Sequence, residues 1–248
     1  MINHSSLLLQ LEGMNILTDP IWSERASPFT WVGPRRHRPP GVQWDDLPPI
    51  DMVLVSHNHY DHLDLPTLRR LTDRGRPEFV VPIGVAALLR SRNIAPAYEL
   101  DWGDSLPLAG ATIHAVPAVH FSGRTFSDRN RTLWCGFLIQ AAGRVVYFAG
   151  DTAFGDHFAE IRQRFGEPHL ALLPAGAYDP SWFMAPVHMN PMEALRAHRV
   201  LAAHTSIAIH CGTFQLADES IDEPKRILQT AATDPSFLVL NNGQFVTL

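Results

Sequence analysis

One run of six residues, His57-Asn58-His59-Tyr60-Asp61-His62, constrains this 248-residue chain more than any other feature. It directly follows Met52–Val55, an apolar run with the length and composition of a buried strand. Imidazole nitrogens suit Zn²⁺, and an aspartate adds an anionic oxygen ligand. Four ligands from one short loop do not easily close around one tetrahedral ion. The motif therefore predicts a site for two ions that share this loop and are completed by residues from elsewhere in the chain.

The missing ligands are expected where other predicted strands end. Three apolar runs lead into residue types that bind metals: Ala111–Val116 into His120, Arg144–Ala149 into Asp151, and Ser206–Ile209 into His210. Open α/β sheets bind their ligands beyond the carboxyl ends of the strands. One such residue alone would be an ordinary hydrogen-bonded polar group. Together with the motif after Met52–Val55, the three indicate one shared metal site.

The rest of the chain mixes strand-like and helix-like segments throughout, which predicts an α/β layered fold. Further strands are predicted at Ser6–Leu11, Asn15–Thr18, Glu78–Val81, Leu133–Ile139, Leu170–Leu173 and Phe237–Leu240. Helices are predicted at Leu65–Arg74, Gly84–Arg92, His157–Phe165, Pro191–Ala203 and Glu223–Ala232. The fourth helix is expected to open with a capping box formed by Asn190 and Glu193. No linker or repeat interrupts the pattern, so residues 1–248 are predicted to form a single domain.

Residues 19–49 form a proline-rich stretch with several large aromatic side chains, Trp22, Phe29, Trp31 and Trp44. No regular element is predicted there, so the stretch is expected to be a long ordered loop or a lid. Two interpretations stay open. Either the aromatic side chains pack the loop against the core, or the loop forms one wall of a substrate site.

Composition narrows the function classes. The 20 Lys and Arg against 25 Asp and Glu give a net charge of −5, which disfavours a sequence-independent nucleic-acid binder. No apolar run is long enough to span a bilayer, and Met1 is not followed by the basic and apolar segments of a signal peptide. The two cysteines, Cys135 and Cys211, are expected to be reduced thiols, so a cytoplasmic location is predicted.

The pattern His57-x-His59-x-Asp61-His62, with the later His120, Asp151 and His210, resembles the metallo-β-lactamase fold superfamily. A closer resemblance covers nearly the whole chain and is to the N-acyl-phosphatidylethanolamine-hydrolysing phospholipase D family. The segments that carry it are Ile16–Pro20, Gly33–Arg36, Ser56–Asp64, Arg129–Trp134, Gly176–Met184, His188–Pro191 and His210–Phe214. The resemblance implies a four-layer αβ/βα sandwich, in which two facing sheets are flanked by helices.

Two features depart from the family pattern. Cys211 stands where members usually have a tryptophan, which changes the wall beside the ligand His210. The chain also begins in its first predicted strand, without the longer N-terminal part of the animal enzymes. It is therefore expected to be either a truncated chain or a minimal member of the family.

The resemblance also implies a ligand set for two zinc ions, for which Mn²⁺ or Fe²⁺ are alternatives. The set places His57, His59 and His120 on one ion, Asp61, His62 and His210 on the other, and Asp151 on both. Asp61 would also act in catalysis by orienting the attacking hydroxide. The family residue that matches His188 lies by the metals, so His188 is interpreted as a donor of a proton or a hydrogen bond to the substrate. The alternative is a surface histidine at the start of a helix.

Aromatic and basic residues near these motifs are candidates for contact with substrate. Tyr60, Tyr178 and Phe183 are predicted to line a groove for an acyl chain, with simple packing as the alternative. The arginines at positions 124, 129 and 131 are interpreted as solvated charges, with contact to an anionic head group as the alternative.

These observations predict a dinuclear zinc-dependent hydrolase, specifically a phosphodiesterase of the phospholipase D type that acts on N-acyl-phosphatidylethanolamine-like substrates. Two divalent cations, two carboxylates and a hydroxide leave one net positive charge, which favours a phosphodiester over a neutral substrate. The alternative is a metal-dependent lactone or carboxylic ester hydrolase. The negative net charge disfavours a nuclease, and the complete ligand set disfavours a metal-binding protein without activity. The expected partners are a small-molecule or lipid substrate and a membrane surface, with no nucleic acid; no oligomeric state is predicted.

Overall fold

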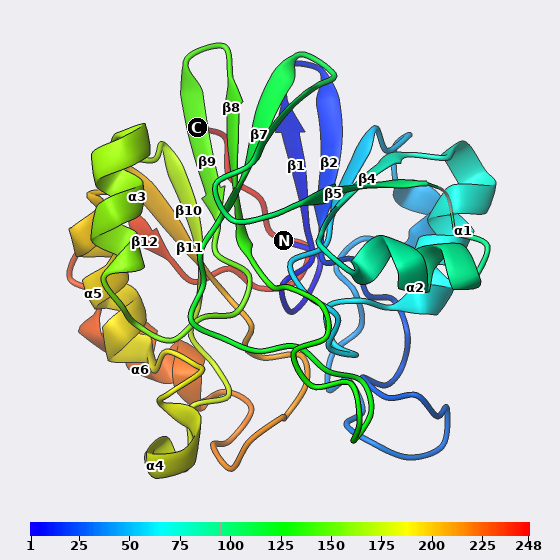
Figure 1. Ribbon diagram of the computed structural model, residues 1–248. Coiled ribbons are helices and arrows are strands. Elements are labelled where there is room, and N and C mark those ends of the chain that lie inside the picture. The colour runs from blue at the N-terminus through cyan, green and yellow to red at the C-terminus, as the bar shows by residue number, and fades with distance from the viewer. Residues whose placement is uncertain (95) are drawn as a thin grey trace.

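Two sheets face each other at the centre of the molecule (Figure 1). The computed structural model describes residues 1–94 and 96–248. The first sheet has the strand order β1-β2-β3-β4-β5, and the second has the order β12-β11-β10-β9-β8-β7-β6. The strands of the first sheet are β1 (Leu7–Leu11), β2 (Met14–Thr18), β3 (Met52–Leu54), β4 (Glu78–Pro82) and β5 (Ala97–Leu100). Those of the second are β6 (Ser105–Leu108), β7 (Ala111–Val116), β8 (Gly136–Ala141), β9 (Arg144–Phe148), β10 (Leu170–Pro174), β11 (Thr205–Ile209) and β12 (Phe237–Leu238).

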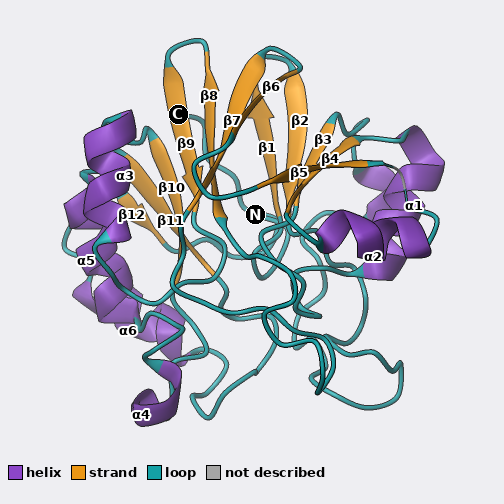
Figure 2. Ribbon diagram, in the orientation of Figure 1, coloured by secondary structure: helices purple, strands orange, loops and turns teal. Residues whose placement is uncertain are grey.

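Helices cover the outer face of each sheet (Figure 2). The first sheet is covered by α1 (Leu65–Gly75) and α2 (Val85–Ser91). The second is covered by α3 (His157–Phe165), α5 (Pro191–Leu201) and α6 (Glu223–Ala231). Two short turns, α4 (Ser181–Met184) and the 3₁₀ helix η1 (Trp44–Asp46), lie in loops. The predicted four-layer αβ/βα sandwich is therefore confirmed.

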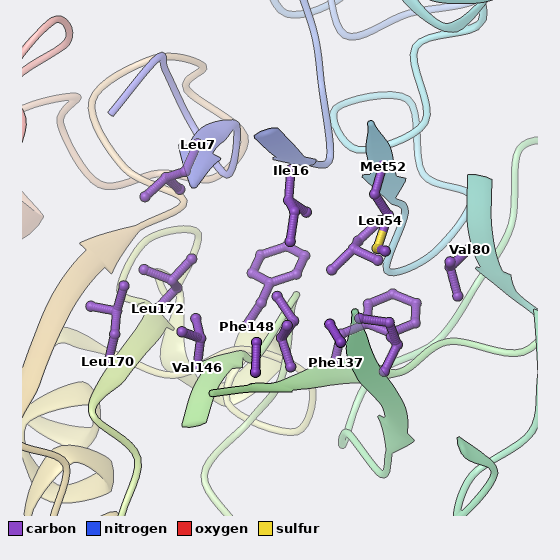
Figure 3. Close-up of a cluster of buried hydrophobic side chains, with 14 of the residues drawn as sticks. Leu7, Ile16, Met52, Leu54, Val80, Phe137, Val146, Phe148, Leu170 and Leu172 are labelled. Carbon is purple, nitrogen blue, oxygen red and sulfur yellow. The ribbon is translucent and has the colours of Figure 1, made fainter. Parts of the chain in front are cut away.

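The main apolar core fills the space between the two sheets (Figure 3). Side chains of the first sheet such as Ile16, Met52 and Leu54 face Phe137 and Phe148 of the second, and all are buried. Successive residues of a strand point to opposite faces, so the residues between them pack against the helices instead. This double burial explains why the central strands are apolar on both faces.

The strand directions bring several chain segments to one edge of the two sheets. β2 and β3 are parallel, and β7 and β9 point the same way because both are antiparallel to β8. β10 and β11 are parallel to β9. The carboxyl ends of these strands therefore lie at one edge, the lower one in Figure 1, together with the amino end of the antiparallel β1.

Every predicted strand and helix is present, with shifts of a few residues at the ends. The largest shift is in β8, predicted from Leu133 and observed from Gly136, because β7 stops at Val116, just before Pro117. The capping box at Asn190 is confirmed: its side chain accepts from the Glu193 backbone N–H, and the Glu193 side chain accepts from the Asn190 N–H.

The elements that the sequence did not predict are β5, β6, α4 and η1. β5 and β6 each lie at one edge of a sheet, and both are partly exposed, so neither carries the long apolar run of a buried strand.

The proline-rich stretch 19–49 was interpreted either as packing against the core or as one wall of a substrate site, and different parts of it fit each interpretation. Trp22 and Trp44 contact each other edge to face at 5.5 Å and pack against the core beside α1, whereas Phe29 lines a cavity and Trp31 is exposed. No helix within residues 1–94 and 96–248 is both long enough and apolar enough to cross a bilayer.

Candidate metal centre

The side chains that the sequence assigns to metal binding lie together at the lower edge of the sheets. Residues 57–62 follow β3, His120 follows β7, Asp151 follows β9 and His210 follows β11. All of the assigned residues are buried except His59, which is half-buried. The fold therefore gathers ligands from four strand ends at one point.

One group of ring nitrogens is formed by His57, His59 and His120. The Nδ1 atom of His59 lies 2.8 Å from Nε2 of His57 and 3.2 Å from Nε2 of His120. Burial holds the pKa of His57 and of His120 well below the ordinary value, so both rings are neutral near pH 7. Neutral ring nitrogens that face one another with no carboxylate between them can together coordinate a cation.

A second group surrounds the carboxylate of Asp61. Its Oδ2 atom lies 3.1 Å from Nε2 of His62 and 3.2 Å from Nε2 of His210. A third histidine, His4, lies closer still, with its Nε2 atom 2.9 Å from the same oxygen. The sequence assigned no role to His4.

Asp151 lies between the two groups. Its Oδ2 atom is 3.0 Å from Nε2 of His210 and 3.1 Å from Nε2 of His62 on one side, and 3.8 Å from Nε2 of His120 on the other. Although burial opposes it, the charges of His210 and His62 hold the pKa of Asp151 well below its ordinary value, so this carboxylate is ionised. A single oxygen within reach of both groups is what a bridging ligand requires.

The residues present fit a bound metal. Asp151 Oδ1 and His62 Nε2 are buried and have no hydrogen-bond partner, although buried polar atoms are normally paired. Both atoms belong to ligand types that bind Zn²⁺, Mn²⁺ and Fe²⁺, and both residues are members of groups that could hold a metal ion. A bound cation would give both unpaired atoms a partner.

A network behind the cluster orients three of the histidines. His62 Nδ1–H donates to Asp19 Oδ2 at 2.6 Å, and Ser56 Oγ–H donates to the same oxygen at 2.6 Å. His57 Nδ1 lies 2.9 Å from Ser56 Oγ, which accepts its proton, and His120 Nδ1–H donates to the carbonyl oxygen of Val187 at 2.9 Å. Each bond leaves the Nε2 lone pair free to face the cluster.

Asp19 was not predicted as a site residue, although a signal was present. It directly follows the predicted strand Asn15–Thr18, as Asp151 and His210 follow theirs. The expectation that site residues lie where predicted strands end would therefore also have selected Asp19.

Arg124 corrects an interpretation made from the sequence, because it is not a solvated charge. Its Nη1 atom donates to the carbonyl oxygens of Asn58 at 2.8 Å and Leu63 at 2.9 Å, and its guanidinium lies 3.8 Å from the centre of the Tyr60 ring. The two carbonyls lie on either side of His59, Asp61 and His62. Arg124 therefore clamps the ligand loop from outside.

The clamp predicts that Arg124→Lys weakens metal binding although it keeps the charge. A lysine ammonium is a compact point charge that does not reproduce the planar fork of the guanidinium. We expect the affinity for metal to fall about 10-fold, at the lower end of the usual effect of groups that support ligands. Competition with a chelator measures this, with the exposed Arg131→Lys as control. Equal affinities in the two variants would show that the clamp is dispensable.

His188 is buried beside the cluster, so the alternative of a surface histidine is wrong. Its Nδ1 atom lies 3.9 Å from Asp151 Oδ2, and its ring stacks on that of His210 at 5.4 Å. Burial lowers the pKa of His188 to about 4. The ring lies just before the capping residue Asn190, at the amino end of α5.

The three aromatic residues predicted to contact substrate lie in different places. Tyr60 lines a cavity of about 740 Å³, and its hydroxyl donates to the Arg124 carbonyl oxygen at 3.0 Å. The Tyr178 hydroxyl donates to Glu223 Oε1 at 2.7 Å. Phe183 is exposed on α4. Of the three, only Tyr60 is among the described residues that line this cavity.

Cys211 is a buried free thiol next to His210. Burial raises its pKa to about 11, so the thiol is protonated near pH 7.

Comparison with known proteins identifies the family. A family profile described as "Beta-lactamase superfamily domain" matches residues 14–211. The N-acyl-phosphatidylethanolamine-hydrolyzing phospholipase D 1 of Caenorhabditis elegans is 36% identical over 261 residues, which cover 98% of this chain and 73% of the worm protein. The chain belongs to the N-acyl-phosphatidylethanolamine-hydrolysing phospholipase D family of the metallo-β-lactamase superfamily. The family predicted from the sequence is therefore confirmed, and the histidine–aspartate cluster is the metal-binding cluster of a family of metal-dependent hydrolases.

Two further comparisons give a relative of similar sequence and a solved structure of similar fold. An uncharacterised protein of Mycobacterium tuberculosis is 44% identical over 234 residues, which cover 92% of this chain and 62% of the mycobacterial protein. The chain thus spans less than two thirds of that relative. The isothiocyanate hydrolase from Delia radicum gut bacteria has the same fold, with a TM-score of 0.78 at 22% identity, covering 100% of this chain and 97% of that one.

Proposed function

We propose that this protein is a dinuclear zinc-dependent phosphodiesterase of the phospholipase D type, acting on N-acyl-phosphatidylethanolamine-like substrates. The position of Asp151 carries the proposal, because its Oδ2 atom lies within 4.0 Å of ring nitrogens from both histidine groups. The name of the worm relative supports the choice of substrate. The zinc ligands would be His57, His59 and His120 on one side, Asp61, His62 and His210 on the other, and Asp151 between them.

Two divalent cations held by these residues would supply a nucleophile from water at neutral pH and would stabilise the attacking and leaving oxygens of a phosphoryl centre. Side chains of the protein are proposed to orient the reacting groups and to hold the ligands. The Asp61 carboxylate orients the attacking group, because it faces the cluster from the ligand loop. His188 lies next to Asp151 and donates a hydrogen bond to the leaving side, or a proton once a bound anionic substrate raises the pKa of its ring. Asp19 and Ser56 hold the ligand rings in place.

The cavity beside Tyr60 suits a lipid with an anionic head group. It has a volume of about 740 Å³, and Phe29, Leu65 and Leu88 give it apolar walls. Arginine side chains from several loops also line it, including Arg92 and Arg131. Apolar walls bind an acyl chain, and arginines attract a phosphate. Tyr178 and Phe183 are proposed to contact the acyl chain further out, towards α4.

Exposed aromatic residues around the same edge support peripheral contact with a membrane. Trp31, Phe126 and Trp182 lie on three separate loops, and each is at least 74% exposed. The loops that carry them all project from the lower edge in Figure 1. Tryptophan and phenylalanine on exposed loops suit the boundary between head groups and acyl chains. Such contact would present a membrane lipid directly to the site.

The function is tested with the purified protein and N-acyl-phosphatidylethanolamine in mixed micelles. We expect phosphatidic acid and N-acylethanolamine as products, with no opening of a simple lactone under the same conditions. Lactone or carboxylic ester turnover without phosphodiester turnover would replace the proposal by the alternative hydrolase.

Elemental analysis gives an independent test of the metal centre. The seven proposed ligands form two groups that share Asp151, so we expect two zinc ions per chain. Anomalous scattering should place one ion at each group. A single ion with His210 uncoordinated contradicts the dinuclear proposal.

A further inference from the structure

His4 belongs to a buried group of possible ligand atoms together with Asp61, His62 and His210, and no sequence motif assigns it a role. It lies just before β1, at the edge where β2 and β3 end, because β1 is antiparallel to β2. Its side chain is fully buried, and its Nε2 atom lies 2.9 Å from Asp61 Oδ2. A buried imidazole this close to a carboxylate has a defined partner rather than a solvent contact.

The backbone fixes His4 in this position. Its N–H donates to Thr213 Oγ1 at 2.8 Å, and its carbonyl oxygen accepts from the His210 N–H at 3.0 Å. Its backbone is left-handed, with φ 43°, a conformation that few residues other than glycine adopt. The His4 ring centre lies 4.2 Å from that of His210. The segment before β1 is thus attached to the segment that carries a proposed ligand.

The contacts of His4 differ from those of the proposed ligands. The Nε2 atoms of His62 and His210 lie within 3.2 Å of both Asp61 and Asp151. Within residues 1–94 and 96–248, the carboxylate paired with His4 is that of Asp61. His4 therefore pairs with Asp61 and not with the bridging carboxylate.

The hydrogen bonding of the ring indicates which nitrogen carries the proton. The Nδ1 atom of His4 is buried without a partner. A proton there would be an unpaired buried donor, which is costly, whereas a proton on Nε2 points directly at Asp61 Oδ2. His57, His62 and His120 show the opposite pattern, with an acceptor for Nδ1 and with Nε2 facing the other ligand atoms.

We propose that His4 is a positioning residue that donates its Nε2–H to Asp61 Oδ2 and so holds this carboxylate against the metal on the Asp61 side. Asp61 lies on the short loop after β3, and its Oδ2 atom contacts His4 as well as the proposed ligands His62 and His210. His4 acts through Asp61 and does not itself bind the metal. The inference rests on the metal centre of the proposed function but not on its substrate.

The test compares two substitutions. His4→Gln keeps a side-chain N–H donor, and His4→Phe keeps a ring but has no donor. Zinc affinity is measured by competition with a chelator, and the zinc content of the same samples by elemental analysis. We expect His4→Phe to bind one of two ions about 10–100-fold more weakly, the usual effect of losing a group that supports a ligand. We expect His4→Gln to bind both ions as the unchanged protein does.

A matched control is His198→Phe, which replaces a buried histidine on α5 that is hydrogen-bonded to Ser206 and is not among the ligand groups. This variant should keep both affinities. Unchanged zinc affinity in His4→Phe overturns the proposal, as does equal loss in His4→Gln and His4→Phe. Fewer than two ions in the unchanged protein would instead overturn the dinuclear centre, which separates the two failures.

A measurement on the unchanged sequence covers the case in which His4→Phe does not fold. The protein is labelled with ¹⁵N-histidine and loaded with ¹¹³Cd²⁺, and the His4 signals are assigned from the His4→Gln spectrum. We expect ¹¹³Cd coupling at the ring nitrogens of the proposed ligands, and at His4 a proton on Nε2 with no coupling to cadmium. Coupling between cadmium and His4 would make it a ligand and would overturn the positioning role.

Discussion

Asp151→Asn is expected to lose one of the two metal ions and most of the activity. The substitution keeps the size of the side chain but removes its charge and replaces one oxygen by an amide nitrogen. Asp151 Oδ2 lies 3.0 Å from His210 and 3.1 Å from His62, at the centre of the cluster. Loss of one partner from a buried charge pair costs about 3–5 kcal/mol. At about 1.4 kcal/mol per factor of ten, metal affinity should fall roughly 10²–10⁴-fold.

Zinc content and phosphodiester turnover, measured on the same sample, test this expectation. The control is Asp73→Asn, which changes an exposed aspartate on α1 and should leave both quantities unchanged. Thermal unfolding of both variants without metal shows whether the fold is kept. Normal zinc content together with normal turnover in Asp151→Asn would rule out the bridging position.

The outline of the fold and of the cluster follows from local sequence patterns. Apolar runs of strand length identify every central strand, because these strands are buried on both faces. The same runs locate His120, Asp151 and His210, because a parallel arrangement brings carboxyl ends of strands to one edge. Both predictions can be made without knowing which distant parts of the chain contact each other.

The supporting residues depend on contacts that no local pattern contains. His4 precedes a strand rather than following one, so its place beside Asp61 becomes clear only when β1 is known to be antiparallel to β2. Arg124 reaches the carbonyls of Asn58 and Leu63 from a loop more than sixty positions away. In the sequence it is one arginine among several on a polar loop. The role of Arg124 is decided by its tertiary contacts.

Two edge strands, β5 and β6, were missed for a related reason. Each pairs on one side only and is partly exposed, and neither has the apolar run that identifies the central strands and the edge strand β1. Their position is set by their neighbours, since β5 pairs with β4 and β6 pairs with β7.

His188→Gln is expected to lower kcat by roughly 10²–10⁴-fold, the usual contribution of general acid–base catalysis. The His188 ring is buried next to Asp151 and stacks on His210, so it lies beside the proposed metal centre without being one of its ligands. It is not among the proposed ligands, so zinc content should stay at two ions per chain. The control is His204→Gln, at a histidine whose side chain is 57% exposed, where a surface change should have an effect within about 0.5 kcal/mol.

Two substrates separate the possible roles of His188. The alcohol released from a natural lipid substrate is a poor leaving group that needs a proton. The aryl oxide released from an activated aryl phosphodiester leaves unaided. If His188 gives a proton, the loss in kcat should be large on the lipid and should shrink sharply on the aryl ester. An equal loss on both substrates, with zinc retained, would instead assign His188 to electrostatic stabilisation of the phosphoryl oxygens. No loss on either substrate would contradict both roles, because a ring buried at 3.9 Å from Asp151 would then contribute only to packing.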